Sequence, residues 1–318
     1  MAENRGQYAI ECSGLTRRFG TFTAVDDLTL GVKPGELFGF LGPNGAGKTT
    51  AINILTTLLT PSAGNAVVAG FDLVENAPLV RAKIGVVPQQ FALFEELTPL
   101  ENLWYIGELY GMDGGEARKR SDELLKIVAL YEKRGIKAST FSGGMKQSLS
   151  IAASLVHSPQ ILFMDEPTSG LDPQSRIALR ELTSTLNQTG MTIIYTTHDM
   201  EEAEKLCQRI AIMDHGKLIA LGTPNELKSM DGHGFKISLE LSRADAALAE
   251  GLKKLARAQS ASCRGHTVEL RVKEPRLGLV QEIAAYLSKA RVELKNFTSN
   301  EATLEEVFIS LTKKELRN

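Results

Sequence analysis

Short apolar runs alternate with segments of helical apolar spacing along most of the first 230 residues. Residues 37–41 (LFGFL) form a continuous apolar run, which is typical of a strand buried on both faces, and residues 49–59 carry the spacing of a helix. Further apolar runs occupy residues 161–164 and 192–196. The alternation predicts a parallel-rich sheet with helices, built from residues up to about 90 and again from 161 to about 230.

The segment between these two parts has a different pattern. Residues 97–111 and 116–130 both place apolar side chains at helical spacing. We therefore expect a helix-rich insert at about 95–160, inside a first domain of residues 1–230.

A second domain is expected at residues 231–318, after the polar, glycine-bearing segment DGHG. The apolar spacing there changes repeatedly between the period of a strand and that of a helix. The resulting order is a ferredoxin-like βαββαβ arrangement followed by a terminal helix, an α+β fold without a visible catalytic constellation. The strands are expected at 235–241, 258–263, 266–272 and 292–298, and the helices at 243–256, 275–289 and 303–316.

Length and composition agree with two domains and exclude some functions. The chain has 318 residues, 43% of them hydrophobic, and a net charge of −2. It is long enough for one large core and a smaller one. The near-balanced charge gives no support for a general nucleic-acid binder, which usually shows a basic excess. Cys12, Cys207 and Cys263 lie far apart and form no C-x-x-C pair, which indicates reduced thiols in a cytosolic protein.

No stretch of the sequence approaches the roughly 18 uninterrupted apolar residues of a membrane-spanning helix. The first residues, MAENRGQY, lack the apolar core of a signal peptide. We therefore expect that the chain does not cross a bilayer, and that a role in transport would require another polypeptide to form the channel.

The segment GPNGAGKT at residues 42–49 matches the phosphate-loop pattern G-x-x-x-x-G-K-[ST]. It lies between a predicted strand and a predicted helix, the context that distinguishes such a loop from a glycine-rich turn without a ligand. Its backbone N–H groups and the helix N-terminus favour a bound phosphate. Lys48 is expected to reach the β- and γ-phosphates and Thr49 to ligate Mg²⁺. The candidate cradle comprises Gly42, Pro43, Asn44, Gly45, Ala46, Gly47, Lys48, Thr49 and Thr50.

Two acids, Asp165 and Glu166, end the apolar run at 161–164. In open α/β sheets ligands gather at the carboxyl ends of the strands, so both acids should face the phosphates. Asp165 would hold Mg²⁺, and Glu166 would polarise the attacking water. The alternative is that both acids only cap the segment that follows.

Together with four further motifs in the expected order, these features make the chain resemble the nucleotide-binding subunit of an ATP-binding cassette (ABC) transporter over roughly residues 8–230. FSGGM at 141–145 is similar to the family's signature LSGGQ, and SGLD at 169–172 matches its D-loop. Gln89 in VVPQQ and His198 in YTTHD match the Q-loop glutamine and the switch histidine. The resemblance implies a P-loop NTPase fold with a helical subdomain, ATP and Mg²⁺ as ligands, and ATP hydrolysis.

The resemblance also implies a site shared between two subunits. Ser142, Gly143 and Gly144 would contact the γ-phosphate held by the opposite subunit, at a second anion-binding helix terminus. Asp172 would steady the phosphate loop of that subunit, although it is also a suitable N-cap for the helix after it.

Three further roles follow from the resemblance, each with an alternative. His198 would donate to the γ-phosphate, or it is a satisfied histidine of the core. Gln89 would lie near Mg²⁺ and the attacking water, or it is an ordinary loop amide. Phe19, in RRFG, would stack on adenine, or it is a packed aromatic of a turn.

The sequence departs from the usual signature at two positions, where Phe141 replaces Leu and Met145 replaces Gln. Neither residue supplies the phosphate contact. With Met145 at its end, the signature is similar to that of the exporter group that resembles daunorubicin-resistance ATPases. The ending TLEEVF is similar to the C-terminal tail of such ATPases. This tail is either an accessory, regulatory domain or a structural appendage.

The resemblance implies an ATPase that works with a second copy of itself, or a homologous ATPase, and with an ABC-2-type permease at the cytoplasmic face of the cell membrane. Dimer closure and hydrolysis would drive export, with no nucleic-acid partner. The helix bearing Leu103, Trp104 and Tyr105 would either line the groove that docks the permease or pack in the helix core. The alternative function is a soluble ABC ATPase acting on ribosomes or nucleic acid, whose usual second cassette or long coiled-coil insert is not seen here.

Overall fold

The computed structural model describes residues 7–230, 235–272, 277–301 and 303–315. The chain divides into two compact units, residues 1–221 and 222–318. The boundary lies before the helix α8 (Pro224–Ser229), nine residues earlier than the pattern predicts. Helix α8 packs against α11 (Leu304–Glu315), and Lys228 Nζ lies 2.6 Å from Glu301 Oε2, so this helix belongs to the second unit.

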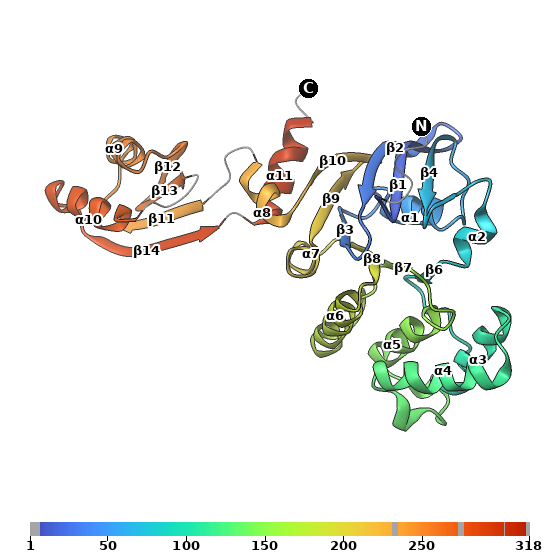
Figure 1. The fold of residues 1–318 in the computed structure, drawn as a ribbon. Helices are drawn as coiled ribbons and strands as arrows, with labels where there is room; N and C mark the ends of the chain where they lie inside the picture. Colours follow the sequence, from blue (N-terminus) through green and yellow to red (C-terminus); the bar gives the residue numbers. More distant parts are fainter. Residues whose placement is uncertain (1–6, 231–234, 273–276, 302, 316–318) are drawn as a thin grey trace. The chain divides into compact units, whose positions relative to one another are not determined.

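A six-stranded sheet with the order β10-β9-β3-β8-β7-β6 forms the centre of the first unit (Figure 1). Strands β3, β8 and β7 are parallel to one another, as are β3 with β9 and β6 with β7, as the apolar runs predict. All residues of β3, β7 and β8 are buried. The strands are β3 (Leu37–Leu41), β6 (Ile84–Val87), β7 (Ile161–Asp165), β8 (Thr192–Thr197), β9 (Arg209–Asp214) and β10 (Lys217–Gly222).

The N-terminal strands form a separate antiparallel sheet, β2-β1-β4-β5, so the expectation of a parallel-rich sheet was wrong for this part. The first two strands join in a tight hairpin in which Phe19 pairs with Phe22. Irregularities in β1 after Cys12 interrupt its alternation of buried and exposed residues and hide the pattern of an antiparallel strand. The bounds are β1 (Ile10–Phe19), β2 (Phe22–Val32), β4 (Ala63–Val68) and β5 (Phe71–Asp72).

One hydrophobic core joins this antiparallel sheet to the central sheet. Leu15, Val25 and Leu28 of the former share a buried cluster with Phe38 and Phe40 of β3. Helix α1 (Lys48–Leu55) contributes Ile52, Ile54 and Leu55 to the same cluster. It ends four residues before the predicted position, because Thr57 adopts a left-handed backbone with φ of 65°. Helix α2 (Ala77–Arg81) adds Val80 to this cluster, and the unit also contains α6 (Pro173–Gln188) and α7 (Met200–Leu206).

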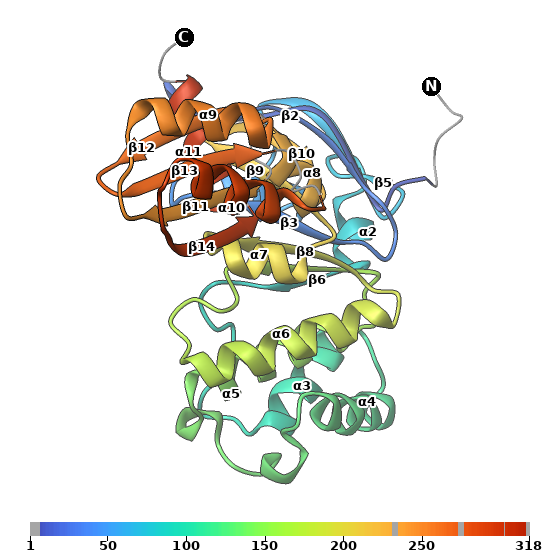
Figure 2. The same cartoon turned by 90° about the vertical axis from the view of Figure 1, so that its left-hand side faces the viewer.

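The predicted insert is helical and lies at one end of the first unit. Helices α3 (Pro99–Leu109), α4 (Gly114–Ile127) and α5 (Gly143–Ser154) pack on one another, and α6 lies against α5 (Figures 1 and 2). Two short 3-10 turns, η1 (Tyr131–Lys133) and η2 (Ala138–Thr140), connect α4 to α5. Thr98 and Glu101 form a capping box at the start of α3, and Asp113 caps α4.

The second unit has the predicted ferredoxin-like order. Its antiparallel sheet runs β12-β13-β11-β14, and the apolar faces of α9 and α10 share one core with it. Ile237, Leu239, Val268 and Leu270 are fully buried there. Among the described residues, no helix is long and apolar enough to span a membrane. The bounds are β11 (Phe235–Leu241), α9 (Ala246–Ala256), β12 (Ser260–Arg264), β13 (Thr267–Val272), α10 (Leu279–Lys289) and β14 (Leu294–Glu301).

Candidate nucleotide site

The phosphate loop leads from β3 into α1, and its backbone requires glycine. Gly45 and Gly47 have φ of 82° and 101°, in the left-handed region that favours glycine. A Cβ atom at Gly42 would overlap the Met213 carbonyl oxygen, and one at Gly47 would overlap the Ala24 carbonyl oxygen. The Gly216 N–H also donates to the carbonyl of Ala46 at 3.0 Å. The neighbouring strands therefore hold the loop in one shape, which is a fitting cradle for phosphate.

Lys48 lies inside this loop and is only 4% exposed. Its Nζ donates to the carbonyls of Gly42 and Pro43 at 2.8 and 3.1 Å and lies 3.2 Å from Oε1 of Glu166. The ammonium group is thus fixed at the mouth of the loop, where a phosphate would meet it.

Thr49 and Asp165 bring two oxygen atoms together beside the loop. The Thr49 hydroxyl donates to Asp165 Oδ1 at 3.2 Å, and the Thr196 hydroxyl donates to the same oxygen at 2.6 Å. Among the described residues no cluster of three or more His, Cys, Asp or Glu side chains could hold a metal. A hydroxyl and a carboxylate beside a phosphate cradle nevertheless fit Mg²⁺, which usually takes one or two protein oxygens and completes its shell with phosphate and water.

Glu166 is buried and lies between Lys48 and His198. Its Oε2 atom is 3.2 Å from His198 Nδ1, while Oε1 contacts the lysine. Its backbone has φ of 44°, which is unusual for a residue with a side chain, and its N–H donates to the Thr196 hydroxyl at 2.8 Å. His198 is 52% exposed, so it is not a satisfied histidine of the core.

Among the described residues, neither Gln89 nor Phe19 is hydrogen-bonded to this cluster. Gln89 is exposed in the segment after β6, and Phe19 is 45% exposed at the end of β1. The guanidinium of Arg17 lies over the Phe19 ring at 4.7 Å from its centroid. Phe19 is therefore not a fully packed aromatic, and one part of its ring remains open.

The signature segment starts α5, with Ser142 as its N-cap. The Ser142 hydroxyl accepts from the N–H of Met145 at 3.3 Å. Phe141, which precedes Ser142, is buried. Gly144 lies against α6, since a Cβ atom there would come 2.7 Å from the Cβ of Ser175. Ser142 and Gly143 are exposed, which leaves this helix terminus open to a ligand or a partner.

Asp172 caps α6 at the end of SGLD. Its Oδ1 accepts from the N–H of Ser175 at 3.0 Å, and its Oδ2 accepts from the Ser175 hydroxyl at 2.6 Å. These hydrogen bonds lower the pKa of the exposed Asp172 carboxyl. The capping alternative from the sequence therefore holds, and it leaves the residue exposed beside the signature segment.

Sequence reasoning missed Thr196, although its hydroxyl contacts both acids of the site. The only signal was a pair of threonines between an apolar strand and a histidine, which is common in buried strands. Two more missed residues, Thr168 and Glu202, form a buried group with Thr197 close to this cluster.

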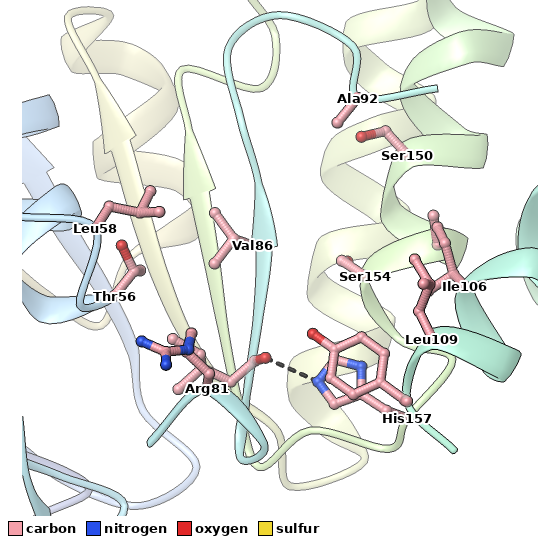
Figure 3. A pocket seen from close by; sticks show the side chains of 13 residues that line it. Thr56, Leu58, Arg81, Val86, Ala92, Ile106, Leu109, Ser150, Ser154 and His157 are labelled. Atoms are coloured by element: carbon pink, nitrogen blue, oxygen red, sulfur yellow. Dashed lines mark hydrogen bonds between the residues drawn. The ribbon is translucent and has the colours of Figure 1, made fainter. Parts of the chain in front are cut away.

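A groove lies between the central sheet and the helical insert (Figure 3). It has a volume of about 330 Å³ and an apolar lining that includes Leu58, Val86 and Ile106. On one side the rings of Tyr110 and His157 stack at 3.8 Å, and His157 Nε2 is 2.8 Å from the Ile84 carbonyl oxygen. Because a carbonyl only accepts, this ring nitrogen carries the hydrogen, and burial lowers the pKa of the histidine.

The groove is lined by the last turns of α3 and not by the three residues considered from the sequence. Leu103 is fully buried, so the helix-core alternative is correct for it. Tyr105 contacts Phe94 edge-on, with 5.0 Å between ring centroids, and both Trp104 and Tyr105 are partly exposed outside the groove.

The fold and the loop geometry define a nucleotide-binding protein of the P-loop class. Residues 25–169 match the family described as ABC transporter. The chain is 39% identical over 312 residues to the linearmycin resistance ATP-binding protein LnrL of Bacillus subtilis, covering 97% of this chain and 100% of that one. It is 40% identical over 309 residues to the daunorubicin/doxorubicin resistance ATP-binding protein DrrA of Streptomyces peucetius, covering 96% and 92%.

A third relative is the Nod factor export ATP-binding protein I of Cupriavidus metallidurans, 36% identical over 309 residues with 97% and 99% covered. Among solved structures, cbiO1 of Clostridium perfringens, described as part of the ABC transporter complex cbiONQ, covers 70% of this chain and 92% of its own with 27% identity and a TM-score of 0.66. A dimeric ATP-binding cassette bound to ADP and phosphate covers 67% and 98% with 30% identity and a TM-score of 0.61.

The chain belongs to the ABC transporter family and is one of its ATPase subunits. The family and the fold class predicted from the motifs are thereby confirmed.

Proposed function

We propose that this chain hydrolyses ATP to power export through a separate membrane-spanning permease. The proposal is based mainly on one cluster at the adjoining ends of β3, β7 and β8. In it, Glu166 contacts Lys48 and His198, and Thr49 is hydrogen-bonded to Asp165. The relatives named for drug resistance and for export cover nearly the whole chain, which supports this direction of transport.

In this proposal each residue of the cluster has a defined role. The phosphate loop, from Gly42 to Thr50, binds the phosphates, and Lys48 neutralises the β- and γ-phosphate oxygens. Glu166 accepts the proton of the attacking water, and His198 donates to the γ-phosphate and orients Glu166. Both side chains lie at hydrogen-bond reach of one another, as such an arrangement requires.

Thr49, Asp165 and Gln89 would hold Mg²⁺ together with the phosphates. The bound ion supplies charge that stabilises the transferring phosphoryl group. Thr196 keeps the Asp165 carboxylate oriented, because its hydroxyl donates to the oxygen that Thr49 also contacts. Phe19, at the end of β1, would stack on the adenine base with the exposed part of its ring.

The site would be completed by a second copy of the chain or by a homologous ATPase. Among the described residues, Ser142, Gly143 and Gly144 form no hydrogen bond to the cluster of their own chain, yet Ser142 and Gly143 are exposed at a helix terminus suited to an anion. We propose that they contact the γ-phosphate of the opposite subunit, and that Asp172 steadies its phosphate loop. The dimeric cassette among the similar structures supports this arrangement.

The groove beside α3 is proposed as the docking site of an ABC-2-type permease, which would place the chain at the cytoplasmic face of the membrane. It is apolar, and Leu58 and Leu109 at its edge are 66% and 67% exposed. Exposed apolar side chains around a cavity mark interaction surfaces. The domain of residues 231–318 is proposed as an accessory or regulatory part.

An affinity pull-down of the tagged Glu166→Gln variant from detergent-solubilised cells with ATP tests the function. Stoichiometric recovery of a multi-span membrane protein supports the proposal. A matched Leu58→Glu/Leu109→Glu variant should lose that partner while still binding ATP. If the Glu166→Gln protein with an unchanged groove instead recovers ribosomal or DNA-bound proteins and no membrane partner, the proposal is overturned in favour of a soluble ATPase.

A further inference from the structure

A buried carboxylate, Glu202, bridges two segments that flank the nucleotide site. Its Oε2 atom accepts hydrogen bonds from the hydroxyls of Thr168 and Thr197, each at 2.9 Å. Thr168 lies between Glu166 and the SGLD segment, and Thr197 directly precedes His198. The three side chains are 3–8% exposed, so water does not compete for these hydrogen bonds.

The direction of each hydrogen bond in this group is fixed. The Thr197 hydroxyl oxygen accepts from the N–H of Asp199 at 2.9 Å and points its hydrogen at Glu202. Asp199 in turn accepts from the N–H of Glu202 at 3.0 Å. Since a carboxylate oxygen only accepts, the Thr168 hydroxyl also has to donate to it. One oxygen atom therefore holds two threonines, one in the turn after β7 and the other at the end of β8.

No ion pair to Glu202 occurs among the described residues, which makes its position costly. A buried carboxylate without a countercharge is stabilised mainly by the hydrogen bonds that it accepts. Burial together with the nearby Glu202 raises the pKa values of Tyr195 and Cys207, so these neighbours add no charge of their own near neutral pH. The Tyr195 hydroxyl also lies close to Glu202 and Thr168, but among the described residues the two threonine hydroxyls are the side-chain donors hydrogen-bonded to this carboxylate.

The group also determines where His198 lies. The residues on both sides of His198 are tied by the Thr197 hydroxyl, which contacts Asp199 and Glu202. The half-exposed imidazole has a single hydrogen-bond partner among the described side chains, Glu166. Its place therefore depends on the backbone that carries it, and that backbone is joined through Glu202 to the segment after Glu166.

We propose that Glu202 is a positioning residue that makes the start of the SGLD segment and the His198 segment move as one element. This inference rests on the proposed roles of Glu166, His198 and Asp172. If SGLD meets the opposite subunit, a shift of this segment on closure reaches His198 through Thr168, Glu202 and Thr197. The reacting groups of one site would thereby respond to the partner.

Three variants test the link: Thr168→Val, Thr197→Val and Glu202→Gln. Each valine variant removes one hydroxyl with little change in volume, and we expect kcat to fall about tenfold while KM for ATP stays within about twofold. The double valine variant should be no worse than the poorer single one, because either change breaks the same link. Glu202→Gln should keep kcat within about threefold, since its amide oxygen still accepts both hydroxyls.

Thr192→Val is the matched control. Thr192 is equally buried at the other end of β8, and its hydroxyl accepts from the Gly35 N–H at 2.9 Å. It should lose comparable thermal stability and keep its kcat. All rates are to be measured at a temperature below the lowest unfolding midpoint among the variants, so that every variant is folded during the assay.

The ring resonances of His198, assigned in NMR spectra by comparison with His198→Gln, give a readout that does not require ATPase activity. Thr168→Val should shift them, while Thr192→Val should not. Unshifted resonances, or equal losses of kcat in Thr168→Val and Thr192→Val, would overturn the link. A shift in a protein without any ATPase activity would instead preserve the link and overturn the proposed function.

Discussion

Glu166 is the single residue on which the chemistry of the site depends most. One of its oxygens contacts Lys48 and the other contacts His198. We expect Glu166→Gln to lower kcat by about 10²-fold or more, because the amide cannot accept a proton. ATP should bind at least as tightly as before, since Lys48 loses a competing negative charge.

Single-turnover ATP hydrolysis and the equilibrium binding of a fluorescent ATP analogue measure the two effects separately. Glu201→Gln, on the exposed side of α7, is the control and should behave like the unchanged protein. A Glu166→Gln variant with near-normal turnover would remove this residue from the role of base.

The three cysteines allow the burial of individual side chains to be tested. Burial raises the pKa of Cys12 from its ordinary value of 9.0 to about 11 and also raises that of Cys207, while Cys263 is partly exposed. Because the thiolate is the reactive form, iodoacetamide at a pH near 8 should alkylate Cys263 first. Mass spectrometry after timed quenching measures this, and rapid labelling of Cys12 in the native protein would contradict the structure.

The raised pKa of Cys12 also predicts the sign of a pH effect. The folded state keeps the proton up to a pH of about 11, whereas an unfolded chain releases it near the ordinary value of 9.0. The contribution of this thiol to the unfolding free energy is therefore fully present below that ordinary value and is lost as the pH rises through about 11. A Cys12→Ala variant should show a weaker loss of stability over this pH range in urea titrations.

At the scale of elements, the contact between α5 and α6 makes a prediction about the two signature glycines. A Cβ atom at Gly144 would come 2.7 Å from Ser175 Cβ, whereas one at Gly143 would meet only Leu171 Cδ2 at 3.4 Å. Gly144→Ala should therefore cost about 1–3 kcal/mol of unfolding free energy through overpacking, and Gly143→Ala much less.

Urea unfolding of the monomer measures both changes. Adding Ser175→Gly should return part of the stability lost in Gly144→Ala, because it removes the atom in the way. Equal costs for the two glycines, or no recovery in the double variant, would show that the two helices do not pack as described.

The sequence patterns predicted most elements of the chain, and the reasons are local. The strand at 37–41 is a continuous apolar run and lies at Leu37–Leu41 in the structure, and the order of the second unit follows from alternating periods. The antiparallel sheet was not foreseen, because bulges in β1 break its alternation. The end of α1 was missed because only the positive φ of Thr57 marks it.

At the scale of the whole molecule, the site combines segments that are far apart in sequence. Motif spacing predicted Lys48, Thr49, Asp165, Glu166 and His198, and the structure brings their side chains together. Thr168, Thr196 and Glu202 could not be predicted, since their importance comes from hydrogen bonds across more than 29 residues of chain, between residue types that are common everywhere. The roles of Gln89, Phe19, Ser142–Gly144 and Asp172 remain predictions.

The central claim is that two copies of the chain hold ATP between them. The most direct measurement is the mass of the Glu166→Gln protein by size-exclusion chromatography with light scattering, with and without ATP and Mg²⁺. A site shared between two copies predicts a change from 34.6 kDa to twice that mass when ATP is present. Ser142→Arg, introduced into the same variant, should still bind ATP but remain monomeric. A protein that binds ATP and stays at the single mass, or a Ser142→Arg variant that still dimerises, would contradict the shared site.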